Sequence, residues 1–149
     1  MRIAIGSDHG GFQLKQQLVH LLDEWQIAYE DFGILTSDAA DYPDIAVPVA
    51  RSVASGAFDR GILVCGTGIG MSIAANKIPG IRAAMAYDVE TARLGREHND
   101  ANILTIGGRT TPLDRARDIV RVFLQTAFDG GGRHSRRIQK ISALDCKDS

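Results

Sequence analysis

Short apolar runs alternate with longer segments whose apolar residues recur at helical spacing, and this pattern continues along the whole chain. Brief aliphatic or alternating runs bounded by turn-forming residues are typical of strands, and they predict strands at residues 2–6, 28–32, 61–65, 81–85 and 103–106. Apolar residues three or four positions apart are typical of one face of a helix, and they predict helices at residues 14–25, 43–53, 69–76, 89–97, 112–127 and 135–143.

Strands that alternate with helices predict a parallel sheet with right-handed crossovers and helices on both faces. We therefore expect a three-layer, Rossmann-like α/β fold with five strands in the flavodoxin-like order 2-1-3-4-5 and an extra C-terminal helix. No internal repeat, low-complexity block or linker divides the sequence, so residues 1–149 are expected to form a single domain. Ligands of such sheets bind beyond the carboxyl ends of the strands at the switch point, here between the first and third strands.

The charge balance excludes some classes of partner. The 17 Lys and Arg residues nearly match the 18 Asp and Glu residues, giving a net charge of −1, so no global field recruits nucleic acid or an anionic membrane. No signal peptide and no run long enough to span a bilayer is found, and a soluble cytoplasmic protein is expected. The two cysteines, Cys65 and Cys146, are expected to be reduced thiols, and Cys146 to be incidental. No Cys/His spacing suggests a metal site.

The segment CGTGIG, from Cys65 to Gly70, is the most informative motif. It joins a predicted strand to a predicted helix, where free backbone N–H groups favour negative charge. Cys65 adds a thiol that can move a proton, although most free cysteines are small buried core residues. The motif is not a Walker A loop, and Met71 replaces the third glycine of the dinucleotide fingerprint. The segment is therefore typical of chemistry on an anion.

Polar residues at two other positions are candidates for the same chemistry. Asp8 and His9 directly follow the first strand and are predicted to face the switch-point crevice, with a polar helix cap as the alternative. His98 and Asn99 end the fourth helix, where an acid or base and a helix C-cap are equally compatible with the sequence.

A basic cluster follows the glycines at residues 130–132. Arg133 and Arg137 are four positions apart and would share one helix face. Arginine side chains suit a phosphate group, while a solvated basic surface is the ordinary alternative. The glycines allow a tight chain reversal toward a site.

Six segments carry a resemblance to a known family: GSDHGGF at residues 6–12, DYPD at 41–44, CGTGIGMSIAANK at 65–77, GIRAA at 80–84, HND at 98–100 and GGRHSRR at 131–137. Together they resemble the ribose-5-phosphate isomerase B family, in order along nearly the whole chain. The family also contains galactose-6-phosphate and allose-6-phosphate isomerases. The resemblance implies a Rossmann-like fold, no cofactor or metal, and a homodimer or homotetramer with active sites at the dimer interface.

The resemblance also implies an activity and roles for named residues. The activity is interconversion of D-ribose 5-phosphate and D-ribulose 5-phosphate through an enediolate, in the non-oxidative branch of the pentose phosphate pathway. Cys65 matches the catalytic base, His98 the acid/base that opens the sugar ring, and Thr67 a hydroxyl that assists proton movement. The remaining matches are substrate contacts: Asp8, His9, Gly66, Gly68, Ile69, Gly70, Asn99, Arg109, Arg133 and Arg137. One branch of the family uses a glutamate instead of the cysteine, but Met71 occupies that position here.

Three alternatives stay open at this point. The substrate is either a pentose phosphate or a six-carbon sugar phosphate such as allose 6-phosphate. The strand pattern also suits a nucleotide- or flavin-binding module, although the fingerprint is absent. A catalytically silent subunit of a hetero-oligomer is disfavoured, because every matched catalytic position is filled.

Overall fold

The computed structural model describes residues 1–145, so the prediction for Cys146 lies outside the described residues. Its centre is a parallel sheet of five strands in the order β2-β1-β3-β5-β4. The strands are β1 (Arg2–Ser7), β2 (Ala28–Asp31), β3 (Arg60–Cys65), β4 (Ala83–Met85) and β5 (Ile103–Gly107). The predicted Rossmann-like α/β fold is confirmed.

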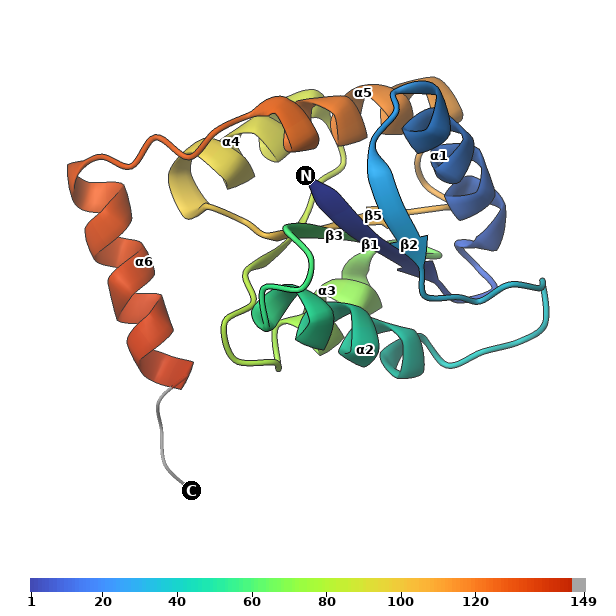
Figure 1. The fold of residues 1–149 in the computed structure, drawn as a ribbon, viewed down its shortest axis with the longest axis horizontal. Coiled ribbons are helices and arrows are strands. Elements are labelled where there is room, and N and C mark those ends of the chain that lie inside the picture. The colour runs from blue at the N-terminus through green and yellow to red at the C-terminus, as the bar shows by residue number, and fades with distance from the viewer. Residues whose placement is uncertain (146–149) are drawn as a thin grey trace.

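Helices cover both faces of the sheet. They are α1 (Phe12–Glu24), α2 (Tyr42–Ala54), α3 (Ile69–Ala75), α4 (Val89–Asn99), α5 (Leu113–Gln125) and α6 (Gly132–Asp145). Figure 1 shows α1, α4 and α5 on one face and α2 and α3 on the other. Each face has its own apolar core, one centred on Ile5, Ile62 and Phe123 and the other on Leu63, Met71 and Ile103.

The predicted order of the last two strands is wrong. In the structure β5 pairs with β3, and β4 lies at the edge of the sheet. All five residues of β5 are buried, whereas the three residues of β4 are partly exposed. A longer apolar strand gains more from an inner position, where both of its faces are covered. The switch point between β1 and β3 is unchanged by this correction.

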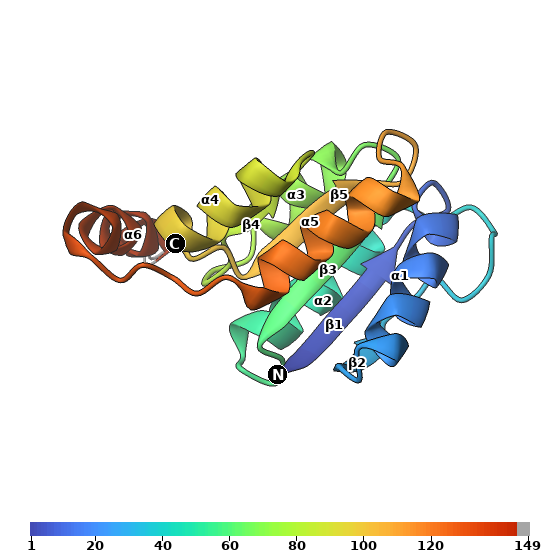
Figure 2. The same ribbon diagram turned by 90° about the horizontal axis from the view of Figure 1, so that it is seen from above.

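Helix α6 lies beside the three layers rather than within them. None of its residues is buried, and its main neighbour is α4 (Figure 2). One side-chain contact ties its end to the body, because the backbone N–H of Gly80 donates to Asp145 Oδ2 at 2.8 Å. Ile141 and Leu144 are 43% and 61% exposed. The helix therefore presents apolar side chains that the rest of residues 1–145 does not cover.

An ion pair with a buried lysine ties α1 to the end of β2. The side chain of Lys15 is fully buried, and its Nζ lies 2.8 Å from both carboxylate oxygens of Asp31. Lys15 Nζ also donates to the carbonyl of Ile34, and Gly33 N–H donates to Asp31 Oδ1 at 2.9 Å. These bonds fix the start of residues 32–41, which lead past the carboxyl ends of the strands to α2.

Among residues 1–145, no helix is long and apolar enough to cross a bilayer.

Candidate active site

A cavity of about 450 Å³ opens at the carboxyl edge of the sheet, beside β1 and β3. It is lined by Asp8, Tyr42, Cys65, Gly66, Thr67, Ile69, Gly70, Ile73 and Arg109. The predicted crevice is therefore present at the switch point, and it contains seven of the residues expected from the sequence. Those residues come from the ends of three strands, because Asp8 follows β1, Cys65 ends β3, and Arg109 lies two residues beyond β5.

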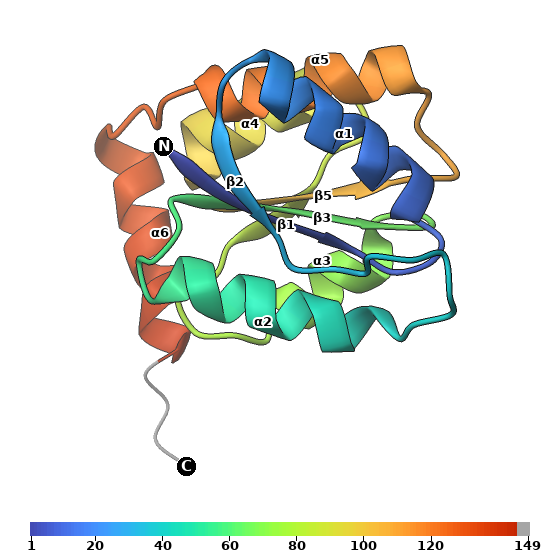
Figure 3. The ribbon, with the colours of Figure 1, turned by 45° about the vertical axis from the view of Figure 1, so that its right-hand side comes forward.

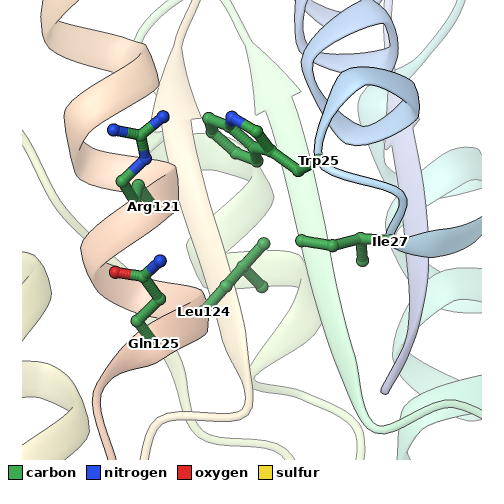
Figure 4. A pocket seen from close by; sticks show the side chains of 5 residues that line it. All are labelled: Trp25, Ile27, Arg121, Leu124 and Gln125. Atoms are coloured by element: carbon green, nitrogen blue, oxygen red, sulfur yellow. The ribbon is translucent and has the colours of Figure 1, made fainter.

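A second cavity, of about 520 Å³, lies between the end of α1 and α5. Figure 4 shows its lining residues, which are Trp25, Ile27, Arg121, Leu124 and Gln125. The guanidinium of Arg121 lies 4.9 Å from the centre of a Trp25 ring. None of the lining side chains exchanges protons near neutral pH. The cavity at the carboxyl edge, which contains a carboxylate and a thiol, is therefore the candidate active site.

Cys65 is the last residue of β3 and is only 4% exposed. The backbone N–H of Gly68 donates to Cys65 Sγ at 3.1 Å. This bond fixes the sulfur at the floor of the cavity, because Gly68 is itself buried at the start of α3. Cys65 was expected to be either a small buried core residue or a thiol at the site. It is buried and it also lines the cavity.

The turn between β3 and α3 depends on glycine at residue 68. Gly68 has a φ of 83°, in the left-handed region that glycine adopts without steric cost. A Cβ there would lie 3.0 Å from the backbone carbon of Ile106. The turn therefore packs closely on β5. Thr67 is exposed and lines the cavity, and its Oγ1 accepts from the N–H of Ile69 at 3.2 Å.

Two backbone bonds place Arg109 beside this turn. Gly108 N–H donates to the carbonyl of Cys65 at 2.7 Å, and Arg109 N–H donates to the carbonyl of Gly66 at 2.9 Å. The segment after β5 is thereby held against the segment after β3. Arg109 thus supplies an exposed guanidinium to a cavity whose other charged group is Asp8.

Asp8 and His9 both take part in local structure. Asp8 is 7% exposed, and its Oδ1 accepts from the N–H of Gly11 at 3.1 Å in the turn before α1. No side chain among residues 1–145 caps α1, so the capping alternative is wrong. The Asp8 side chain lines the cavity. His9 is exposed, and the N–H of Ala40 donates to its Nδ1 at 3.2 Å. This bond places the imidazole against the segment that precedes α2.

Tyr42 lines the cavity but was not predicted as a site residue. It is the first residue of α2, and its ring packs on Gly70, where a Cβ would lie 2.7 Å from the ring. The sequence signal was the DYPD segment at residues 41–44, which we interpreted as the start of a helix. Ile73 was also missed, because helical spacing alone does not show which face of α3 is open.

The remaining predicted site residues lie elsewhere on the chain. His98 and Asn99 end α4, and Arg133 and Arg137 are in α6. Helix α4 leads from the carboxyl end of β4 to the amino end of β5. Its last residues therefore lie at the amino ends of the strands, whereas Cys65 lies at the carboxyl ends (Figure 3). The six residues of β3, at about 3.3 Å each, separate these ends by about 20 Å. One chain alone therefore does not bring the two groups together.

Residues 3–141 match the model of a family described as Ribose/Galactose Isomerase. The chain belongs to this family. It is 52% identical over 149 residues to "Putative sugar phosphate isomerase YwlF" of Bacillus subtilis, with 99% of each chain covered. It is 45% identical to ribose-5-phosphate isomerase B of Escherichia coli, covering 97% of this chain and 96% of the relative. Membership of the Ribose/Galactose Isomerase family makes the chain a sugar phosphate isomerase.

A solved structure supports the same assignment. Ribose-5-phosphate isomerase B from Clostridium thermocellum superposes with a TM-score of 0.95 at 50% identity, with 97% of each chain covered. The relative from Mycoplasma genitalium, solved with bound ribulose-5-phosphate, gives a TM-score of 0.94 at 41% identity. That comparison covers 99% of this chain and 97% of the relative.

Proposed function

We propose that this sugar phosphate isomerase interconverts D-ribose 5-phosphate and D-ribulose 5-phosphate through an enediolate. The observation that carries the proposal is the position of Cys65, whose sulfur is fixed by the Gly68 amide in a cavity that also contains Asp8 and Arg109. The name of the E. coli relative supports the choice of substrate. No support remains for a nucleotide- or flavin-binding module, because the isomerase family matches residues 3–141.

In this proposal Cys65 is the base. Its thiolate takes the hydrogen from C2 of the open-chain aldose, and the electron pair of that C–H bond forms the C1–C2 double bond of the enediolate. The thiol then returns the proton to C1, which completes the ketose without net oxidation. Thr67 moves protons between the O1 and O2 oxygens, and the amides of residues 66–70 stabilise the negative charge. Preorganised donors of this kind contribute about 3 kcal/mol each in a dry site.

A second copy of the chain completes the site in this proposal. Ile69 and Ile73, which line the cavity, are 51% and 59% exposed, and Ile141 and Leu144 of α6 are exposed as well. Apolar side chains at a site rim and on an uncovered helix are typical of a surface that another protein covers. A two-fold symmetric dimer would place His98 of one protomer over Cys65 of the other, where His98 opens the sugar ring. Asn99, Arg133 and Arg137 would then bind substrate there, with the arginines and Arg109 on the phosphate.

Mixing two inactive variants tests this arrangement. Cys65→Ala and His98→Asn should each lack turnover, because each removes a different half of every site. After the two are unfolded and refolded together, about a quarter of the wild-type activity should return, since half of the dimers are mixed and each has one intact site. Native mass spectrometry counts the mixed dimers. If those dimers form and remain inactive, His98 and Cys65 do not act in one shared site.

Turnover measurements test the substrate. We expect kcat/KM for ribose 5-phosphate to exceed that for allose 6-phosphate, because a pocket fitted to five carbons discriminates against the longer chain. Adding a chelator should leave the rate unchanged. A higher kcat/KM for allose 6-phosphate would show that the substrate is a six-carbon sugar phosphate, while the proposed aldose–ketose isomerisation would still hold. Absence of turnover on both sugars would overturn the proposal.

A further inference from the structure

The imidazole rings of His98 and His134 are stacked. Their centroids are 4.2 Å apart and their planes are inclined by 11°. His98 lies in the last turn of α4, and His134 lies in the first turn of α6. His134 follows Arg133 in the segment GGRHSRR at residues 131–137.

The stack is held from both sides by backbone contacts. The N–H of Asp129 donates to the carbonyl of Glu97 at 3.1 Å, which fixes the segment before α6 to the end of α4. The N–H of His134 donates to the carbonyl of Gly131 at 3.1 Å, and Ser135 Oγ donates to the carbonyl of Gly130 at 3.0 Å. The first turn of α6 is therefore fixed in place, although the rest of the helix has few contacts with the body.

We propose that His134 is a positioning residue for His98, and that its ring holds the His98 imidazole in one orientation. This inference rests on the proposed function, in which His98 opens the sugar ring. A ring with one face packed has fewer accessible rotations, so its nitrogens remain aimed in one direction. Misplacement of a catalytic group by about 1 Å can cost a hundredfold in rate.

The surrounding charges disfavour a proton on His134. Two imidazolium rings at 4.2 Å would repel strongly, because little solvent lies between stacked rings. Arg133 and Arg137 of α6 add positive charge, while Asp129 before α6 opposes them. Glu97 of α4 is paired with Arg93 at 2.7 Å, and Asp100, which follows α4, is paired with Arg96 at 2.8 Å. Partial desolvation lowers the pKa of His134, and the neighbouring His98 and Arg133 lower that pKa further.

Two substitutions at residue 134 separate positioning from other roles. His134→Phe keeps an aromatic face against His98, whereas His134→Ala removes it. We expect kcat to fall by roughly tenfold to a hundredfold in His134→Ala and to stay within about threefold of wild type in His134→Phe. The exposed His20 on α1 provides a control, since His20→Ala should leave kcat unchanged. Equal increases of KM in both variants, with kcat unchanged, would instead make His134 a substrate contact, and unchanged kinetics in both would also overturn the proposal.

Nuclear magnetic resonance tests the pair without relying on activity. The Cε1 proton of His98 should show a ring-current shift in wild type that persists in His134→Phe and disappears in His134→Ala. In His98→Phe, the pKa of His134 should rise toward its ordinary value, because one of the causes that lower it is removed. An unchanged titration of His134 would show that the two rings are not in contact. If these shifts are seen but the His98→Asn variant keeps its turnover, the stack exists and the proposed function of His98 fails.

Discussion

Cys65→Ala should lower kcat by about 10²–10⁴-fold, because a positioned base contributes that much to a proton transfer and no neighbouring group replaces the sulfur. The variant should fold normally, since alanine fits the 4% exposed position and removes only one atom from the core. A direct assay of ketose formation measures the effect. Loss of exchange between the C2 hydrogen and solvent deuterium would locate the defect in proton abstraction.

Two further variants make the Cys65 result interpretable. Cys65→Ser retains a hydroxyl at the same place, but a hydroxyl does not ionise near neutral pH, so this variant should be nearly as slow as the alanine variant. Cys146→Ala changes the only other cysteine and should be fully active. Wild-type turnover in Cys65→Ala, with the circular dichroism spectrum preserved, would remove Cys65 from the reaction.

Lys15→Met should destabilise the protein by about 3–5 kcal/mol, because it leaves the carboxylate of Asp31 largely buried without its cation. The Asp31 side chain is 19% exposed, and its remaining contact is the N–H of Gly33. Urea unfolding at a fixed protein concentration measures the loss as a lower transition midpoint. The double variant Lys15→Met/Asp31→Asn should recover part of the stability, since the amide is neutral and still accepts from Gly33.

A surface ion pair that also involves a residue of β2 provides the matched control. Arg2 and Glu30 lie 3.6 Å apart, and both side chains are 54% exposed. Glu30→Gln should therefore change the free energy of unfolding by less than about 1 kcal/mol. If Lys15→Met costs no more than this surface substitution, the buried pair does not stabilise residues 32–41.

Local patterns predicted most of the fold because each strand and helix has its own periodicity. The order of β4 and β5 was not predictable in this way, since periodicity identifies a strand but not its neighbours. Lys15 had no signal either, because a lysine beside Leu14 is ordinarily solvated, and its burial depends on Asp31 being brought to it by the tertiary fold.

The site was predicted in part for a similar reason. Asp8 and Cys65 follow strands that meet at the switch point, so the topology alone placed them together. The role of His98 was assigned by resemblance, which specifies a residue but not the protomer that supplies it. The stack of His98 on His134 depends on how the chain turns into α6 at the glycines 130–132, and no periodic pattern describes that turn.

Because His98 lies at the amino ends of the strands, far from Cys65, the rate of isomerisation should depend on how far the enzyme is diluted. If ring opening and proton abstraction come from different protomers, a lone chain is inert whatever its stability. Mass action then applies to the enzyme itself, and below the dissociation constant of the dimer the rate falls with the square of chain concentration.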